Sequence, residues 1–270
     1  MANSGNSCNN HFPMNKKADS GALQPPFPDA ALSLEAIRNV LCRLEETILF
    51  GLLERAQFLH NPIIYEPDGA GSSLGGESLV GFLLCEMERS YALVRRYMSP
   101  DEVPFHAHLP APLLPRLDTP SPLHPNQVNL NAELRSLYER EIVPTFCSPG
   151  DDGQWGSSTV NDISLLQALS KRVHYGKFVA ESKYRKETAR YDAWILAKDE
   201  TALLNAITEA SMETLVLDRV WHKASVYGLE LDSGPGLHRV HPDTVRDIYA
   251  RWIIPLNKRV QVLYLLSRKT

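Results

Sequence analysis

The feature that most constrains this chain is the spacing of its apolar residues, which follows the helical period in one segment after another. Close to the N-terminal end, apolar side chains recur three or four positions apart, at Leu34, Ile37, Leu41, Leu44, Ile48 and Leu52. A helix carries residues with this spacing on one face. The pattern therefore predicts an amphipathic helix over residues 34–58, with Ser33 as its N-cap.

Six further helical segments are expected along the rest of the chain. The longest covers residues 159–186, and the others are expected over 78–97, 130–146, 188–198, 199–226 and 242–267. Pro144 and Pro255 should interrupt two of them, because proline lacks the amide hydrogen that a helix interior needs. No segment shows convincing strand alternation. The predicted fold class is all-α: a single-domain multi-helix bundle with long helices, which we expect to be homodimeric.

The predicted organisation is a disordered tail followed by one folded domain. Residues 1–31 are polar and rich in Asn, Ser and Pro, which favours disorder, whereas residues 32–270 carry the helical pattern. The whole chain has 270 residues, of which 43% are apolar, and this is enough for a sizeable core. We expect one helical domain over residues 32–270.

Charge and cysteine usage argue against several classes of protein. The net charge of −4 gives no basic field for nucleic acid or an acidic membrane surface, and no apolar run reaches the length of a membrane span. The four cysteines form no C-x-x-C pair, and His106 and His108 have no third ligand in view. We therefore expect no metal site and a cytoplasmic protein, or a plastid protein if a longer precursor exists.

The segment with the clearest chemistry lies in the longest predicted helix. Arg172, Gly176, Val179 and Lys183 follow one another at spacings of four, three and four, so they form one stripe. The two cations stand about 16 Å apart along the helix axis, and Gly176 would open room between them. Two inward cations on a largely apolar helix suit a small dianion. A solvated basic face explains the segment equally well.

Other helices offer weaker candidates. Arg38 forms a second stripe with Cys42, Glu45 and Leu49. Asn257 and Gln261 are one turn apart on the last helix, and so are Glu209 and Glu213 further upstream. Each of these taken alone is more often a surface residue than a site residue.

Several segments, taken together and in order, resemble the all-helical chorismate mutases of plants and fungi. The resemblance is strongest in the helix from Ala168 to Lys183. It continues in Ile37-Arg38 with Glu45-Glu46-Thr47-Ile48, in Arg95-Arg96-Tyr97 with Ser99-Pro100-Asp101-Glu102, in Gly150-Asp151-Asp152-Gly153 with Gly156-Ser157, and in Ile254-Pro255-Leu256 with Tyr264-Leu265-Leu266. It runs from about residue 33 to the C-terminus.

The resemblance implies a homodimer that rearranges chorismate to prephenate without metal or cofactor, with one site in each subunit. By position, Arg38 and Arg172 would hold the two carboxylates, and Lys183 would donate to a carboxylate and to the ether oxygen. Glu213 would accept from the ring hydroxyl. Asn257 and Gln261 would complete the site where the family commonly has Thr and Glu. Arg259 and Leu263 also replace residues that are usually acidic.

The same resemblance implies regulation by aromatic amino acids. Tyrosine, tryptophan and phenylalanine are the candidate effectors, and the matching positions are Arg95 and Arg96 of one subunit with Gly156 and Ser157 of the other. Gly153, Gln154 and Val160 differ from the fungal pattern, which leaves the choice of effector open. The alternative for the arginine pair is that it caps a helix C-terminus.

Two other functions stay open at this level. The first is a catalytically silent helical dimer that binds an aromatic amino acid or a protein partner, and the altered last helix is its support. The second is a lyase that acts on isochorismate in the same pocket. Arg38, Arg172, Lys183 and Glu213 argue for the mutase.

Overall fold

The helices of this chain surround one long central rod. The computed structural model describes residues 32–115, 120–229 and 238–268, so the predicted tail over residues 1–31 lies outside the described residues. The rod is formed by α5 (Trp155–His174) and α6 (Gly176–Lys186), which follow each other with one turn residue, Tyr175, between them. In the described part of the chain there is no β-strand, and the predicted all-α fold class is confirmed.

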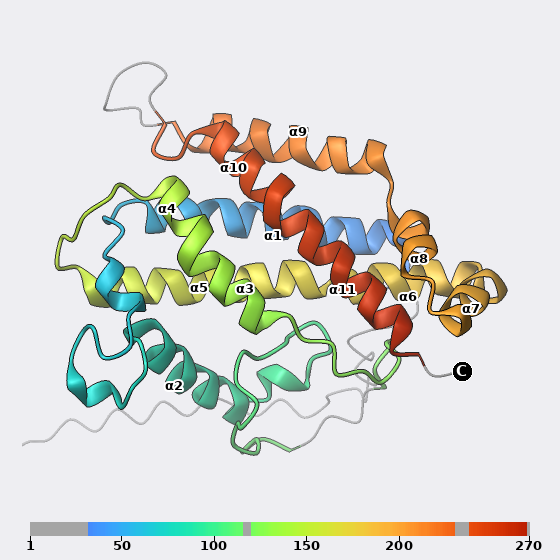
Figure 1. Ribbon diagram of the computed structural model, residues 1–270, viewed down its shortest axis with the longest axis horizontal. Helices are drawn as coiled ribbons and strands as arrows, with labels where there is room; N and C mark the ends of the chain where they lie inside the picture. Colours follow the sequence, from blue (N-terminus) through green and yellow to red (C-terminus); the bar gives the residue numbers. More distant parts are fainter. Residues whose placement is uncertain (1–31, 116–119, 230–237, 269–270) are drawn as a thin grey trace, which may run out of the picture.

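The other long helices lie along this rod. Helix α1 (Leu34–Arg55) packs against α5 on one side and α9 (Ala210–Tyr227) on the other. Helix α11 (Ile254–Leu266) crosses α6 and α5 and also contacts α8 (Glu200–Ile207), as Figure 1 shows. Helix α2 (Leu79–Leu93) packs against α5 from below in that view. Four elements that are distant in sequence, α1, α6, α9 and α11, thereby meet around one space.

Shorter elements connect these helices. They are the α-helices α3 (Asn131–Leu137), α4 (Val143–Phe146), α7 (Thr188–Ala197) and α10 (Pro242–Ile248), the 3₁₀ turns η2 (Pro62–Tyr65), η3 (Ser72–Leu74) and η4 (Arg96–Met98), and the π-helical turns η5 (Tyr138–Ile142) and η6 (Tyr249–Ile253). Pro255 stands in the first turn of α11, directly after η6, so the predicted interruption of the last helix is confirmed and takes the form of a π-helical turn. The interruption expected near Pro144 takes the form of η5.

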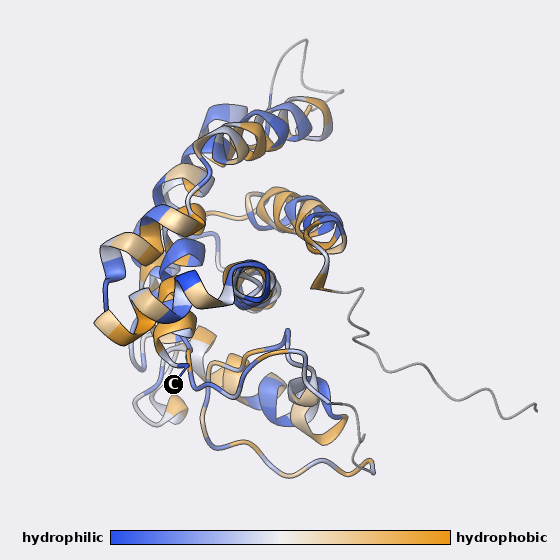
Figure 2. Cartoon of the chain, turned by 90° about the vertical axis from the view of Figure 1, so that its right-hand side faces the viewer, coloured by the Kyte–Doolittle hydropathy of each residue, from blue (hydrophilic) through white to orange (hydrophobic). Residues whose placement is uncertain are grey.

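Helix α1 shows how the sequence defines a helix locally. The hydroxyl of Ser33 accepts a hydrogen bond from the amide of Ala36 at 3.1 Å, as expected for an N-cap. The predicted apolar face is buried, with Ile37, Ile48 and Leu52 no more than 1% exposed. Figure 2 looks along the long helices and shows that they carry both apolar and polar residues, as amphipathic packing requires.

Two helix predictions were wrong in their continuity. The segment 199–226 is two helices, α8 and α9, separated by Thr208 and Glu209 in extended conformations. The segment 159–186 begins earlier, at Trp155, and is broken at Tyr175. In both places the apolar period of the sequence continues through the break, so the period alone did not reveal it.

The buried apolar residues in the described part of the chain form two clusters around these helices. The larger cluster of buried residues joins α1, α2, α3, α5 and α10, and includes Ile48, Leu84, Leu134 and Leu169. The smaller cluster lies at the other end of the rod and includes Ile37, Phe178, Leu203 and Tyr264. None of the helices in the described ranges combines the length and apolar content that crossing a bilayer requires.

Candidate active site

A cavity of about 240 Å³ lies where α1, the α5–α6 rod, α9 and α11 meet. All six residues predicted for the catalytic site line it: Arg38, Arg172, Lys183, Glu213, Asn257 and Gln261. They come from four stretches of the chain that are far apart in sequence, and the fold brings their side chains to one cavity. The wall between them is largely apolar and includes Ile37, Leu41, Val179, Met212, Val216 and Ile254.

Arg172 is the most confined of the cations in this cavity. It stands in the last turn of α5 and is 5% exposed. Its Nε atom is buried and has no hydrogen-bond partner among the described residues. Burying a guanidinium without an acceptor is costly, so an anionic ligand is the expected partner.

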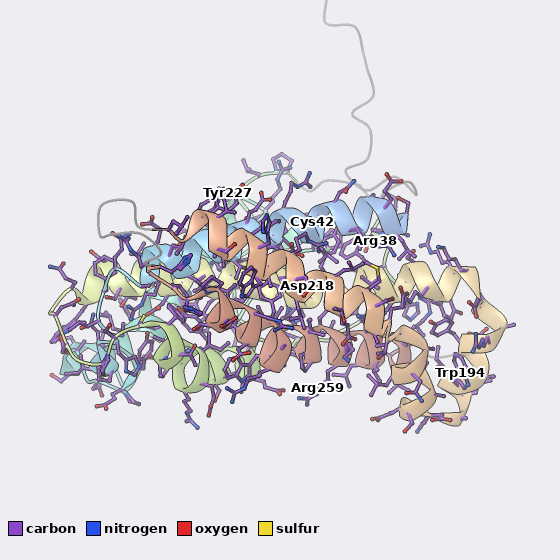
Figure 3. All side chains as sticks on the ribbon, turned by 90° about the horizontal axis from the view of Figure 1, so that it is seen from above. Arg38, Cys42, Trp194, Asp218, Tyr227 and Arg259 are labelled. Atoms are coloured by element: carbon purple, nitrogen blue, oxygen red, sulfur yellow. The ribbon has the colours of Figure 1, made fainter. Side chains whose placement is uncertain are left out.

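Arg38 is the second cation that has no partner among the residues that the structure describes. It lies on α1 on the side that faces α9, close to Cys42, as Figure 3 shows. Unlike Arg172 it is exposed, and its side chain forms neither a hydrogen bond nor an ion pair within the described part of the chain. The cavity thus holds one buried and one accessible guanidinium, and each is free to bind a carboxylate with two hydrogen bonds.

Lys183 is already held by two acceptors. Its Nζ lies 2.9 Å from the backbone oxygen of Ile207 and 2.8 Å from Oε1 of Glu209. The Ile207 carbonyl is the last of α8, and it is available because the helix ends there instead of running on into α9. The unpredicted break at Thr208 therefore contributes directly to the site.

Asn257 and Gln261 form a short hydrogen-bonded chain on α11. The amide of Gln261 donates to Oδ1 of Asn257 at 2.9 Å, and the amide of Asn257 donates to the backbone oxygens of Arg172 and Val173 at 3.2 and 3.0 Å. Asn257 thus ties α11 to the end of α5 that carries Arg172. Gln261 keeps a second amide hydrogen and a buried, unpartnered Oε1 at the cavity.

Two charged residues that line the cavity were not predicted from the sequence, Arg219 and Lys258, and Glu209, a weak candidate that received no role, lines it as well. Arg219 donates two hydrogen bonds to the buried carboxylate of Glu45, at 2.7 and 2.6 Å. Lys258 pairs with Glu213 at 3.0 Å. The spacing of Met212, Val216 and Arg219 on α9 is a usable signal for Arg219. Lys258 adjoins a predicted residue, but nothing local indicates its pairing.

Ion pairing leaves a simple charge balance in the cavity. Lys183 is neutralised by Glu209, Lys258 by Glu213 and Arg219 by Glu45. The cations that remain unpaired among the described residues lining the cavity are Arg38 and Arg172. Two free guanidiniums in a small, mostly apolar space match a small dianion with two carboxylates.

Gly176 has a different role from the one predicted. A Cβ atom at this position would stand 2.8 Å from the backbone oxygen of Asn257, 2.9 Å from its Nδ2 and 3.2 Å from Cγ of Gln261. The glycine therefore lets α11 approach the α5–α6 junction; it does not open space for a ligand between Arg172 and Lys183. The prediction that these two cations face one cavity holds in the structure.

The four predicted effector residues lie away from this cavity. Arg95 donates to the carbonyl of Pro115, and the guanidinium of Arg96 lies 3.2 Å from Glu102 and over the ring of Tyr91. Among the described residues, no hydrogen bond runs from either arginine side chain to a carbonyl of α2. Gly156 and Ser157 are exposed in the first turn of α5.

Arg259, for which the resemblance offered no explanation, also has a partner. It lies on the side of α11 away from Arg38 and pairs with Glu133 of α3, at 2.6 and 2.5 Å (Figure 3). Leu263, one turn further along, is partly buried against the larger core cluster. Arg259 therefore makes a surface ion pair and Leu263 a packing contact, and neither residue lines the cavity.

Fold and site together define an all-helical protein with an internal cavity for a small dianion. The family model for chorismate mutase type II matches residues 157–262. A chorismate mutase of Schizosaccharomyces pombe is 47% identical over 243 residues, which cover 88% of this chain and 96% of the relative. The chain therefore belongs to the chorismate mutase family, and its activity is that of this class of isomerase.

Solved structures agree with this assignment. The chorismate mutase Aro7p of Candida albicans, in complex with L-Trp, superposes with a TM-score of 0.86 at 38% identity, covering 92% of this chain and 95% of that one. AtCM1 with tyrosine in its allosteric site superposes with a TM-score of 0.81 at 41% identity, covering 90% and 98%. The tryptophan and the tyrosine are ligands bound in those two solved structures.

Proposed function

We propose that the cavity is the chorismate mutase site and that its residues act as the sequence predicted. Arg38 and Arg172 hold the two carboxylates of chorismate, Lys183 and Gln261 donate to the ether oxygen, and Glu213 accepts from the ring hydroxyl. The observation that carries this proposal is the charge balance. Two guanidiniums for which the described residues provide no partner face one cavity, and the substrate brings two carboxylates.

The reaction is an intramolecular rearrangement to prephenate, in which the ether C–O bond breaks while a C–C bond forms. The two arginines fix both ends of the substrate, so the enolpyruvyl arm is held over the ring in a reactive conformation. Negative charge grows on the ether oxygen in the transition state, where the Lys183 ammonium and the Gln261 amide stabilise it more than in the ground state. No step requires a nucleophile.

Gln261 should determine the pH response of the reaction. An amide donates a hydrogen bond at any ordinary pH, whereas a glutamate at this position must be protonated to do so. We expect turnover without an acid optimum between pH 5 and 8. Gln261→Glu should convert this profile to one that falls as pH rises and the carboxyl ionises. A wild-type rate that falls steeply above a pH of about 6 would contradict the role of Gln261.

Asn257 is best assigned as a positioning residue. Both amide hydrogens are directed to backbone carbonyls of α5, and its oxygen accepts from Gln261. Asn257 therefore orients Gln261 and the end of α5 that carries Arg172. This differs from a direct contact with substrate, and Asn257→Ala should lower kcat more than it raises KM.

A homodimer with a regulatory site at its interface is the second part of the proposal. Large apolar side chains are exposed on α2, after it and on α5: Phe82, Val94, Leu113, Leu114 and Val160. Arg95 and Arg96 directly follow the exposed Val94, and Gly156 and Ser157 lie one turn before the exposed Val160 on α5. Dimerisation across it would let the two pairs meet between subunits. Tryptophan, tyrosine and phenylalanine are the effectors to test.

The remaining predictions concern organisation and location. A tail over residues 1–31 and a helical domain over residues 32–270 remain the proposed organisation. The proposed location is the cytoplasm, with the plastid as the alternative if a longer precursor exists. A fluorescent fusion of the native precursor would distinguish the two.

The decisive experiment is an assay with purified protein and chorismate at pH 7.5, followed by loss of chorismate absorbance and acid conversion of prephenate to phenylpyruvate. Turnover that Arg172→Ala abolishes would support the assigned site. A folded dimer without turnover between pH 5 and 8 would favour the catalytically silent binding protein. Turnover of isochorismate but not chorismate would favour the lyase.

A further inference from the structure

Lys183 has fewer free donors than its proposed role requires. An ammonium has three N–H donors, and two of them are directed to the backbone oxygen of Ile207 and to Oε1 of Glu209. The proposed function asks Lys183 for a hydrogen bond to a substrate carboxylate and another to the ether oxygen. One of the two existing bonds must therefore be exchanged when substrate binds.

The two acceptors differ in their freedom to leave. Ile207 is 5% exposed and accepts through its backbone at the end of α8, so its carbonyl is fixed by the helix. The side chain of Glu209 is 46% exposed and stands on the extended link between α8 and α9. It makes no capping hydrogen bond to α9. Glu209 is thus the acceptor that can move away.

Glu209 also lies among the cations that a substrate carboxylate would have to approach. It lines the cavity, it binds Lys183, and it lies in the field of Arg38 and Lys186. The hydrogen bond from Lys183 and these charges lower the pKa of the Glu209 carboxyl, so it is ionised near neutral pH. The cations that attract the dianion therefore already attract a carboxylate of the protein.

The other two carboxylates at the cavity are held more firmly. Glu45 is 1% exposed and is bound by both Arg219 and Lys223. Glu213 is 30% exposed and pairs with Lys258, and the proposed function keeps it in place to accept from the ring hydroxyl. Glu209 alone combines a bond to a catalytic cation with a half-exposed side chain, within the described residues of the cavity.

We propose that Glu209 is an internal counter-ion that holds Lys183 in the free enzyme and is displaced by a carboxylate of the substrate. This inference rests on the proposed function of the cavity. Displacement lowers the apparent affinity for chorismate, because each binding event must break the Lys183–Glu209 pair. The displacement does not change the barrier from bound substrate to transition state, because Glu209 has already moved away in both states.

The test is Glu209→Gln, with Glu200→Gln as the matched control. Glu200 is exposed on α8 and does not line the cavity, so both variants remove one negative charge. At pH 7.5 and low salt we expect Glu209→Gln to lower the KM for chorismate about three- to tenfold, with kcat within about twofold of wild type. Glu200→Gln should leave both constants unchanged. The difference in KM should shrink at high salt.

Calorimetric titration with prephenate gives a second readout that does not depend on turnover. The Kd should fall in Glu209→Gln along with the KM. If wild type turns over and binds prephenate but neither constant falls in Glu209→Gln, the exchange is wrong and the proposed function stands. A fall in kcat with unchanged KM would make Glu209 a positioning residue and overturn the proposal. If wild type neither turns over nor binds, the proposed function fails and the exchange fails with it.

Discussion

The two ends of α5 are built in opposite ways. The C-terminal end, with Arg172 and His174, is buried and tied to α11 by the side chain of Asn257. The N-terminal end, with Gly156 and Ser157, is exposed, and a Cβ atom at Gly156 would meet nothing within 4 Å. The catalytic end is completed by other helices of the same chain. The other end is an exposed surface, and it is where we propose that a second subunit contributes.

The largest effect should come from Lys183, just beyond the buried end. Lys183→Ala removes one of the two donors proposed for the ether oxygen, and it should raise the barrier by about 2.7–4 kcal/mol, a loss of roughly 10²–10³ in kcat. Steady-state kinetics measure this. Ser164→Ala, on an exposed position in the middle of α5, is the control and should keep wild-type kinetics. Turnover close to wild type in Lys183→Ala would refute the assigned role.

The buried end should also be sensitive to acid through His174. Its Nε2 accepts from the amide of Leu130 at 3.0 Å, and burial together with Lys177 lowers the pKa of His174 to about 4. Between pH 6.5 and 4 the unfolded state binds more protons, so stability is full above pH 6.5 and is lost as pH falls towards 4. The contribution is up to about 3 kcal/mol.

Urea unfolding as a function of pH measures this contribution. His174→Gln should flatten the decline of the unfolding free energy between pH 6.5 and 4. His222→Gln, on an exposed position of α9, should leave the decline as in wild type. An equally steep decline in His174→Gln would show that other groups cause the acid sensitivity.

Glycine-to-alanine substitutions at the two junctions compare the ends directly. Gly176→Ala places a Cβ atom against the backbone of Asn257, so it should destabilise the fold by about 1–3 kcal/mol through overpacking. Gly156→Ala meets open space and should leave the unfolding free energy unchanged or slightly higher. Equal Tm values for the two variants would contradict the close approach of α11.

The smallest effect should appear only when an effector is present. Arg96 shares the carboxylate of Glu102 with Lys171, the neighbour of Arg172 in sequence. If the exposed end binds tryptophan or tyrosine between subunits, Arg96→Ala should abolish a rate change of about fivefold or more. Kinetics with and without each amino acid measure this. A full response in Arg96→Ala would remove this arginine from the effector site.

Much of the fold was predictable because helix formation is encoded locally. The apolar period identified α1 and the two halves of the split last helix, and proline at position 255 marked the division. The break between α8 and α9 was not predictable, because the apolar period continues across Thr208 and Glu209. Helix α8 packs against α11 and α7, whereas α9 packs against α10 and α1, and these contacts depend on the tertiary structure.

The sequence by itself determined the helical class, the family and six of the residues that line the cavity. It did so because helical spacing and residue identity are properties of single segments. Only the tertiary structure decided which charges are paired. Glu45 meets Arg219 across 174 positions, Glu209 meets Lys183 at a helix break, and Gly176 meets α11. Pairing depends on distances between elements, and packing of the whole chain determines these distances.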